Sequence, residues 1–128
     1  MEIREIINSA DELRNNDISD LKKISWLSEL DESIFEQIVL THEGANPRAF
    51  PYKKDTESLI APDRFRELYE HFLCAKIDYC QNEIDRYEND ITLFERALSQ
   101  FKAWYNENYL PLKKATINTK PSFLRGEK

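Results

Sequence analysis

The longest uninterrupted segment of the sequence, residues 63–110, contains neither Gly nor Pro over 48 positions. Such a run favours helix throughout. Its apolar residues recur alternately three and four positions apart, which places them on one side of a helix. The apolar positions are Leu73, Ile77, Cys80, Ile84, Tyr87, Ile91, Phe94, Leu98, Phe101 and Tyr105. The pattern predicts one buried seam.

The opposite face of this helical run is polar, and we expect it to face solvent. A single helix of this length would span roughly 70 Å, more than one small domain needs. We therefore expect a break at Asn82 or at 89–90, where Asn tolerates the left-handed conformation. Thr92 and Glu95 would suit a capping box that restarts a helix. The predicted solvent-facing residues are Glu70, Asp78, Glu83, Asp85, Glu88, Glu95, Lys102 and Glu107.

The N-terminal part of the chain predicts two further helices. Apolar residues at helical spacing indicate a first helix over residues 3–14, followed by a polar turn at 15–17. A second helix, capped by Ser19 or Asp17, is expected to run to near His42, with Gly44 as its terminator. Its apolar face is wide, which is typical of a helix buried on more than one side.

Residues 44–62 contain three prolines and are predicted to form a long irregular loop. Two interpretations stay open. In one, the apolar side chains, with Leu59 and Ile60 among them, cover one end of the bundle. In the other, the segment is a contact loop for a partner. The contact residues would be Phe50, Tyr52, Lys53 and Lys54.

Charge is distributed unevenly along the chain. Residues 1–110 carry 13 Lys and Arg against 23 Asp and Glu, whereas residues 111–128 carry five against one. The sequence therefore predicts one all-α bundle domain over residues 1–111 and an extended basic arm over 112–128. The arm is either a solubilising terminus or a segment that docks on an acidic neighbour, which could be another copy. The candidate binding residues of the arm are Ile117, Lys120, Phe123, Leu124 and Arg125.

The sequence offers little for catalysis or for a bound cofactor. His71 and Cys74 lie three residues apart, but one Cys-His pair does not complete a zinc site. Cys74 and Cys80 are expected to be reduced core residues. There is no phosphate-binding Gly-rich loop and no Gly-flanked nucleophilic Ser. No apolar run is long enough to cross a membrane. We therefore expect a soluble protein without metal, cofactor or enzymatic activity.

Several segments resemble one family of small proteins encoded among the head genes of long-tailed phages and prophages of Gram-positive bacteria. The resemblance is carried by KISWLSELDESIFEQIVLTHEG (residues 23–44), by the helical run that follows the loop, and by WYNENYLP (residues 104–111). Its most distinctive pieces are WLSELD with THEG, LIAP leading into FRELY, and IDYCQNEIDRY. These proteins are similar to the head-tail connectors, or adaptors, that bind below the portal.

The resemblance implies a virion protein of the neck, assembled in the host cytoplasm. Such connectors form a ring, commonly a dodecamer, on the portal protein and extend the DNA channel towards a tail-side neck or stopper protein. Genomic DNA passes through the lumen without specific binding. The resemblance also implies that the C-terminal arm reaches the portal or a neighbouring subunit. Acidic helix faces would let the genome slide, since carboxylates repel DNA phosphates.

Two other classes of protein remain open at this point. One is a different phage morphogenesis protein, either a tail-completion protein or an assembly chaperone, which would share the small size, acidity and helicity. The other is a host-directed helical binding protein that holds its target with the aromatic loop around Phe50 and Tyr52.

Overall fold

The computed structural model describes residues 1–112, and this part of the chain is all-helical, without a β-strand. Its four α-helices are α1 (Ile3–Leu13), α2 (Asp20–Gln37), α3 (Arg66–Cys80) and α4 (Ile84–Asn108). Short 3-10 turns at Val39–Thr41 and Asp63–Phe65 stand on either side of the loop between α2 and α3. The predicted fold class, a small helical bundle with a long loop, is confirmed.

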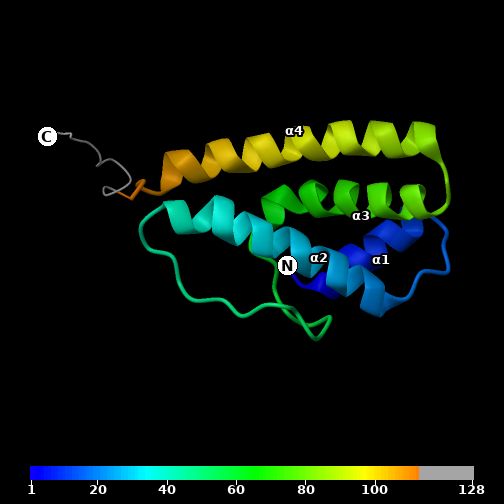
Figure 1. Ribbon diagram of the computed structural model, residues 1–128, viewed down its shortest axis with the longest axis horizontal. Coiled ribbons are helices and arrows are strands. Elements are labelled where there is room, and N and C mark those ends of the chain that lie inside the picture. Colours follow the sequence, from blue (N-terminus) through cyan, green and yellow to red (C-terminus); the bar gives the residue numbers. More distant parts are fainter. Residues whose placement is uncertain (113–128) are drawn as a thin grey trace, which may run out of the picture.

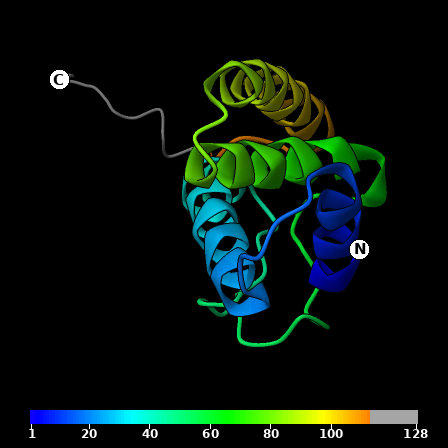
Figure 2. The same cartoon turned by 90° about the vertical axis from the view of Figure 1, so that its right-hand side faces the viewer.

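α3 is the central helix of the bundle. It packs against α1 and α2 on one side and against α4 on the other. In Figure 1 α4 runs along the outer side of α3, and in the end-on view of Figure 2 α1 and α2 lie below α3 with α4 above it. Because α4 packs chiefly on α3, much of its circumference faces away from the bundle.

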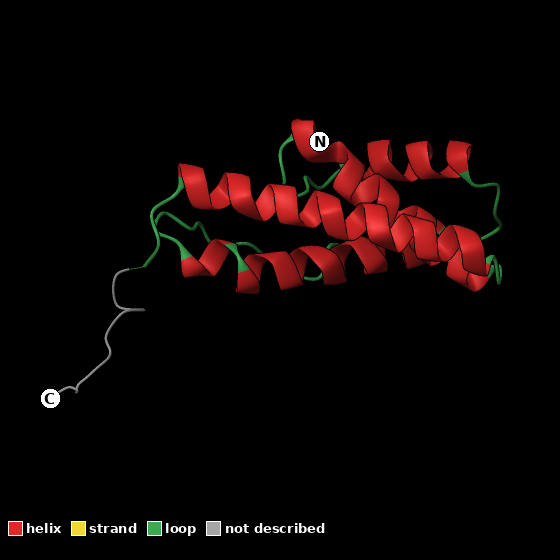
Figure 3. Ribbon diagram, turned by 90° about the horizontal axis from the view of Figure 1, so that it is seen from above, coloured by secondary structure: helices red, strands yellow, loops and turns green. Residues whose placement is uncertain are grey.

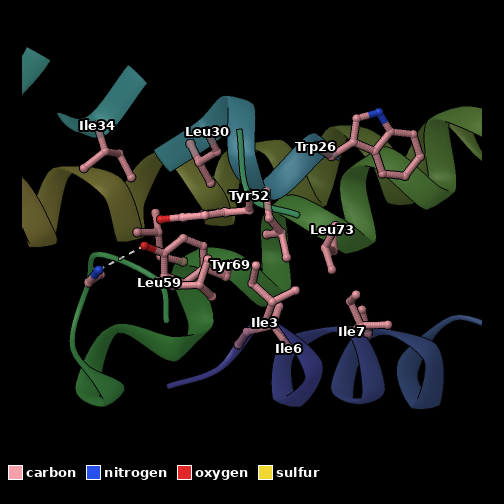
Figure 4. Close-up of a cluster of buried hydrophobic side chains, with 14 of the residues drawn as sticks. Ile3, Ile6, Ile7, Trp26, Leu30, Ile34, Tyr52, Leu59, Tyr69 and Leu73 are labelled. Atoms are coloured by element: carbon pink, nitrogen blue, oxygen red, sulfur yellow. Dashed lines mark hydrogen bonds between the residues drawn. The ribbon is translucent and has the colours of Figure 1, made fainter. Parts of the chain in front are cut away.

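The core lies between α1, α2 and α3. Ile3, Ile6 and Ile7 on one face of α1 are fully buried, as the predicted helical spacing requires. They face Leu30 and Ile34 of α2, with tyrosine rings between the two helices (Figure 4). Each such side chain contributes about 1.5–3 kcal/mol when it leaves water.

The N-terminal predictions agree with the structure. The Ser19 hydroxyl caps α2 by accepting a hydrogen bond from the Lys22 N–H at 3.2 Å. α2 ends at Gln37, and the 3-10 turn that follows ends at Thr41, next to the predicted limit at His42. Gly44 then adopts φ +85°, a value that side chains with a Cβ rarely adopt.

The break in the predicted long helix lies at Asn82, one of the two expected places. Asn82 has φ +60°, and the Glu83 N–H closes the turn on the Asp78 carbonyl at 2.9 Å. The alternative break at 89–90 is wrong because α4 continues through it. The restart predicted from Thr92 is wrong for the same reason: the Thr92 hydroxyl donates back to the Glu88 carbonyl at 3.0 Å.

The prediction of one uniformly buried seam is corrected by this turn. Leu73, Ile77 and Phe101 are fully buried, but Ile84 is 48% exposed. The chain reverses at Asn82, so the seam is divided between α3 and α4, which pack against each other. The seam residues near the turn lie at the end of the bundle. The half-buried members of the seam are Tyr87, Ile91, Phe94 and Leu98.

Two single-residue predictions are also wrong. Cys80, expected in the core, is exposed because it stands at the end of α3, beside the turn. Asp78, expected in solvent, is fully buried because α1 and α4 close over its side of α3. Cys74 is buried as expected.

The loop 44–62 is held against the bundle by backbone hydrogen bonds. The Leu59 N–H donates to the Met1 carbonyl and the Ile3 N–H donates to the Glu57 carbonyl, each at 3.0 Å. The Tyr52 N–H donates to the Ser28 hydroxyl at 2.8 Å. The loop therefore closes one side of the core, as one of the two interpretations of this segment expected.

Residues 110–112 leave the bundle beside the end of α2. The Glu43 N–H donates to the Leu110 carbonyl at 2.8 Å, and the Leu112 N–H donates to the Thr41 carbonyl at 3.1 Å. Figure 1 shows that this exit lies at the opposite end of α4 from the α3–α4 turn, and in Figure 3 the exit again lies at one end of the bundle. The start of the predicted arm therefore has a defined place and direction.

Candidate protein-interaction surface

A groove of about 430 Å³ opens between the second half of α3 and the first half of α4. We call it the α3–α4 groove. It forms because α4 packs on α3 with one part of its apolar face and leaves the rest uncovered. The side chains that define it are Phe72, Lys76, Tyr79, Tyr87, Ile91 and Phe94.

Aromatic pairs across the two helices form most of the groove wall. The Phe72 and Phe94 rings lie 5.3 Å apart between centroids, and so do the Tyr79 and Tyr87 rings. Tyr79 is 65% exposed, which is high for an aromatic ring beside other aromatic rings. Aromatic side chains that are already partly ordered favour protein contacts because they bring large area at small entropy cost.

Charged side chains border the apolar wall. On the α3 side, the Lys76 ammonium lies 5.6 Å from the Phe72 ring centroid and 5.9 Å from that of Trp26. On the α4 side, Glu88 and Glu95 stand three residues before and four after Ile91 in the helix, and both are exposed. Residues at this spacing are neighbours on a helix surface, so the α4 side of the groove is bordered by acids while its α3 side carries Lys76.

A buried charge cluster holds α4 in place on the other flank of α3. Arg14, which follows α1, places its Nε 3.0 Å from Asp78 Oδ2 and its Nη2 3.2 Å from Asp90 Oδ2. Both carboxylates are almost completely buried. Burial and the neighbouring Asp78 raise the pKa of the Asp90 carboxyl to about 6.

A second buried cluster surrounds Asp31 of α2. Its carboxylate accepts hydrogen bonds from the hydroxyls of Tyr52 and Tyr69, each at 2.6 Å, and from the Ile60 N–H at 2.9 Å. Burial raises the pKa of Asp31 and of both tyrosines. The Ala61 N–H donates in turn to the Tyr69 hydroxyl at 3.0 Å. The cluster ties the loop to α2 and α3.

The structure separates the residues predicted for the contact loop. Tyr52 is buried with its hydroxyl on Asp31, so its ring belongs to the core. Phe50 is half-buried, with its ring centroid 5.8 Å from that of Phe35. Lys53 and Lys54 are exposed. A partner-binding role for the two lysines stays a prediction.

The candidate residues of the arm lie outside the described residues. These are Ile117, Lys120, Phe123, Leu124 and Arg125. Within residues 1–112, Tyr109 and Leu110 lead into the arm and are 40% and 69% exposed. The arm therefore continues from an apolar, accessible end of the bundle.

The possible metal ligands are not gathered into a site in the described part of the chain. Cys74 is buried, and burial raises the pKa of its thiol to about 11. His71, three residues earlier, is half-buried. Among residues 1–112, no three His, Cys, Asp or Glu side chains are grouped so that they could hold a metal ion.

Sequence reasoning missed both buried clusters and the groove. Tyr87, Ile91 and Phe94 were predicted on the apolar seam, whereas Phe72, Lys76 and Tyr79 were not. Spacing along one helix does not say which part of its apolar face stays uncovered. The buried partners of Arg14 and Asp31 are distant in sequence. Only the pairing of helices brings them together.

The described helices include none long and apolar enough to span a bilayer. The chain was compared with protein-family models, with curated proteins and with solved structures, and no match was found in any of the three comparisons.

Proposed function

We propose that this chain is a non-enzymatic structural protein of a phage virion, a head-tail connector that forms a ring below the portal. The observation that carries the proposal is the α3–α4 groove, an aromatic surface left open on a bundle that is otherwise acidic. An open aromatic surface suits a chain that works between partners. The motifs WLSELD, LIAP and IDYCQNEIDRY resemble those of connectors, and this resemblance is the reason for proposing a connector ring as the assembly.

The charge of the body supports passage of DNA through such a ring. Residues 1–110 carry a net charge of -10, counting 13 Lys and Arg against 23 Asp and Glu. A lumen lined by carboxylates repels phosphates at short range, so DNA slides without adhering. In this proposal the ring extends the channel, joins the capsid to the tail-side neck protein, and needs the arm for its binding to the portal.

The test is co-sedimentation of the full chain with purified portal rings of the phage or prophage that encodes it. We expect saturable binding at one copy per portal subunit, or another fixed ring stoichiometry. A chain with residues 112–128 deleted should lose this binding while it keeps its helical circular dichroism spectrum. If the deletion variant binds as tightly as the full chain, the arm is not needed for portal binding.

The same measurement separates the other candidate functions. An assembly chaperone would bind unassembled portal subunits and be absent from finished particles. A host-directed binding protein would ignore portal rings and form a stoichiometric complex with its target. Failure of the full chain to bind portal rings at any concentration tested would overturn the connector proposal.

A further inference from the structure

We propose that the α3–α4 groove of one copy receives the C-terminal arm, residues 112–128, of a second copy. The inference deepens the proposed function, on which it rests, because it names the contact that would join ring neighbours. Each copy would give its arm to one neighbour and its groove to the other. A contact of this heterologous kind can close into a ring.

Apolar surface is the first ground for this pairing. The groove wall is aromatic, and Tyr79 stays 65% exposed on it. The arm contains the adjacent apolar residues Phe123 and Leu124, with Ile117 six residues before Phe123. An apolar segment placed in the groove would remove both surfaces from water at about 25 cal/mol per Å² buried.

Charge complementarity is the second ground. On the α4 side of the groove the exposed acids Glu88 and Glu95 are helix neighbours of Ile91, whereas Lys76 borders the α3 side. The arm residues that flank the apolar pair are basic, with Lys120 before it and Arg125 after it. Opposite charges at the rim of an interface guide approach and set the register of the bound segment.

Reach favours the arm of a second copy over that of the same copy. The arm leaves the bundle beside Thr41, at the far end of α4 from the α3–α4 turn (Figure 1), and Tyr79 and Tyr87 lie close to that turn in the sequence. Tyr109, the residue directly after α4, stands 22 residues after Tyr87, which is about 33 Å at 1.5 Å per residue. Phe123 follows Leu112 by 11 residues, a span of at most about 40 Å when fully extended. An arm bound in its own groove would have to reverse and then run almost straight, whereas a neighbour's groove can be placed at the exit.

Two variants of the full chain test the exchange. The groove variant carries Tyr79→Lys and Glu88→Lys, both at exposed positions, so its core is unchanged. The arm variant carries Phe123→Asp and Leu124→Asp. The control carries Leu21→Lys and Glu36→Lys, which change the charge of exposed α2 residues by the same amount as in the groove variant.

The readout is sedimentation velocity over a range of concentrations, without portal. We expect the wild type and the control to self-associate equally, and each test variant to have a dissociation constant raised by about tenfold or more. An equimolar mixture of the two variants should form a heterodimer, because it contains one intact arm and one intact groove. Association of the mixture that stops at the dimer is the specific signature of arm exchange.

Three results would overturn the inference: a wild type that stays monomeric, a groove variant that associates like the control, or a mixture that forms no heterodimer. None of these depends on the portal. Failure of portal co-sedimentation with intact self-association would instead overturn the connector proposal and leave the exchange standing.

Discussion

Arg14 Nη2 lies 3.2 Å from Asp90 Oδ2, and this contact joins the residue after α1 to the first half of α4. α4 otherwise packs chiefly on α3. The Arg14 side chain is 19% exposed and that of Asp90 is 4% exposed, so solvent screens the pair only weakly. Arg14 also holds Asp78 of α3, and a single guanidinium therefore fixes the relative position of three segments.

Replacement of Arg14 by Ala should destabilise the protein strongly. The variant leaves Asp78 and Asp90 buried without a cation, and removal of one partner from a buried pair costs about 3–5 kcal/mol. Urea unfolding followed by circular dichroism measures the loss. The control is Arg4→Ala, because Arg4 pairs with the partly exposed Asp20 and Asp55 and such pairs contribute about 0–1 kcal/mol. Equal losses in the two variants would contradict the importance assigned to the cluster.

The pH dependence of stability should carry a signature of Asp90. Its pKa is raised to about 6 in the folded protein, above the value of about 3.9 in the unfolded chain. The folded state then binds more protons between these pH values, so this group stabilises the fold below pH 4 and loses that contribution as pH rises through 6. Asp31, whose pKa is also raised, acts in the same direction.

The Asp90→Asn variant isolates this contribution. We expect the difference in free energy of unfolding between wild type and variant to change between pH 4 and pH 7, in favour of the variant as pH rises. Urea titrations at several pH values measure it. A difference that is constant over this range would show that Asp90 titrates at an ordinary pKa in the folded protein.

Loss of the Tyr69 hydroxyl should destabilise the loop and the core together. Tyr69→Phe removes one of the donors to the Asp31 carboxylate and the acceptor of the Ala61 N–H. Leaving buried polar groups unpaired costs about 1–3 kcal/mol. Thermal unfolding of Tyr69→Phe is compared with that of Tyr79→Phe, where the side chain is 65% exposed. A similar loss in the two variants would mean that the Asp31 cluster does not hold the loop.

The turn at Asn82 should tolerate Gly and reject β-branched residues. Asn82 has φ +60°, where a β-branched side chain is strained by about 1–2 kcal/mol relative to right-handed backbone. We expect Asn82→Val to lower stability by that amount and Asn82→Gly to leave it equal or higher. Asn89→Val, an exposed position within α4, is the control. Thermal unfolding of all three variants measures these effects. A loss of stability from Asn89→Val equal to that from Asn82→Val would contradict the left-handed turn at Asn82.

The two cysteines should differ sharply in reactivity. Cys74 is buried with a raised thiol pKa, whereas Cys80 is exposed at the end of α3. Thiolate accessibility controls alkylation. A thiol reagent should therefore modify one cysteine rapidly in the native protein and both in denaturant. Peptide mapping should locate the rapid site at Cys80, and rapid modification of Cys74 in the native state would contradict its place in the core.

Several features of the fold could be predicted because they are local. The spacing of Ile3, Ile6 and Ile7 sets which face of α1 is apolar, and the Ser19 hydroxyl reaches the Lys22 N–H within one turn. Asn82 interrupts the long helix because a single residue in the left-handed conformation suffices to reverse the chain. Each of these depends on residues within a few positions of one another.

The surroundings of Asp78 and Cys80 could not be predicted in this way. Both belong to α3, and helical spacing alone placed Asp78 in solvent and Cys80 in the core. The structure reverses both, because Arg14 and Asp90 close over Asp78 from distant segments and Cys80 stands beside an open turn. A periodicity describes one helix, and burial depends on what packs against it.

The sequence by itself determined the helical class, the ends of α1, the cap of α2 and the division of charge between an acidic body and a basic C-terminal segment, because these follow from neighbouring residues and from composition. Tertiary structure alone decided which part of the long apolar seam stayed open. α4 folds back on α3 and covers only part of its aromatic surface, and it is held there by Arg14, which is 76 residues before Asp90 in the chain.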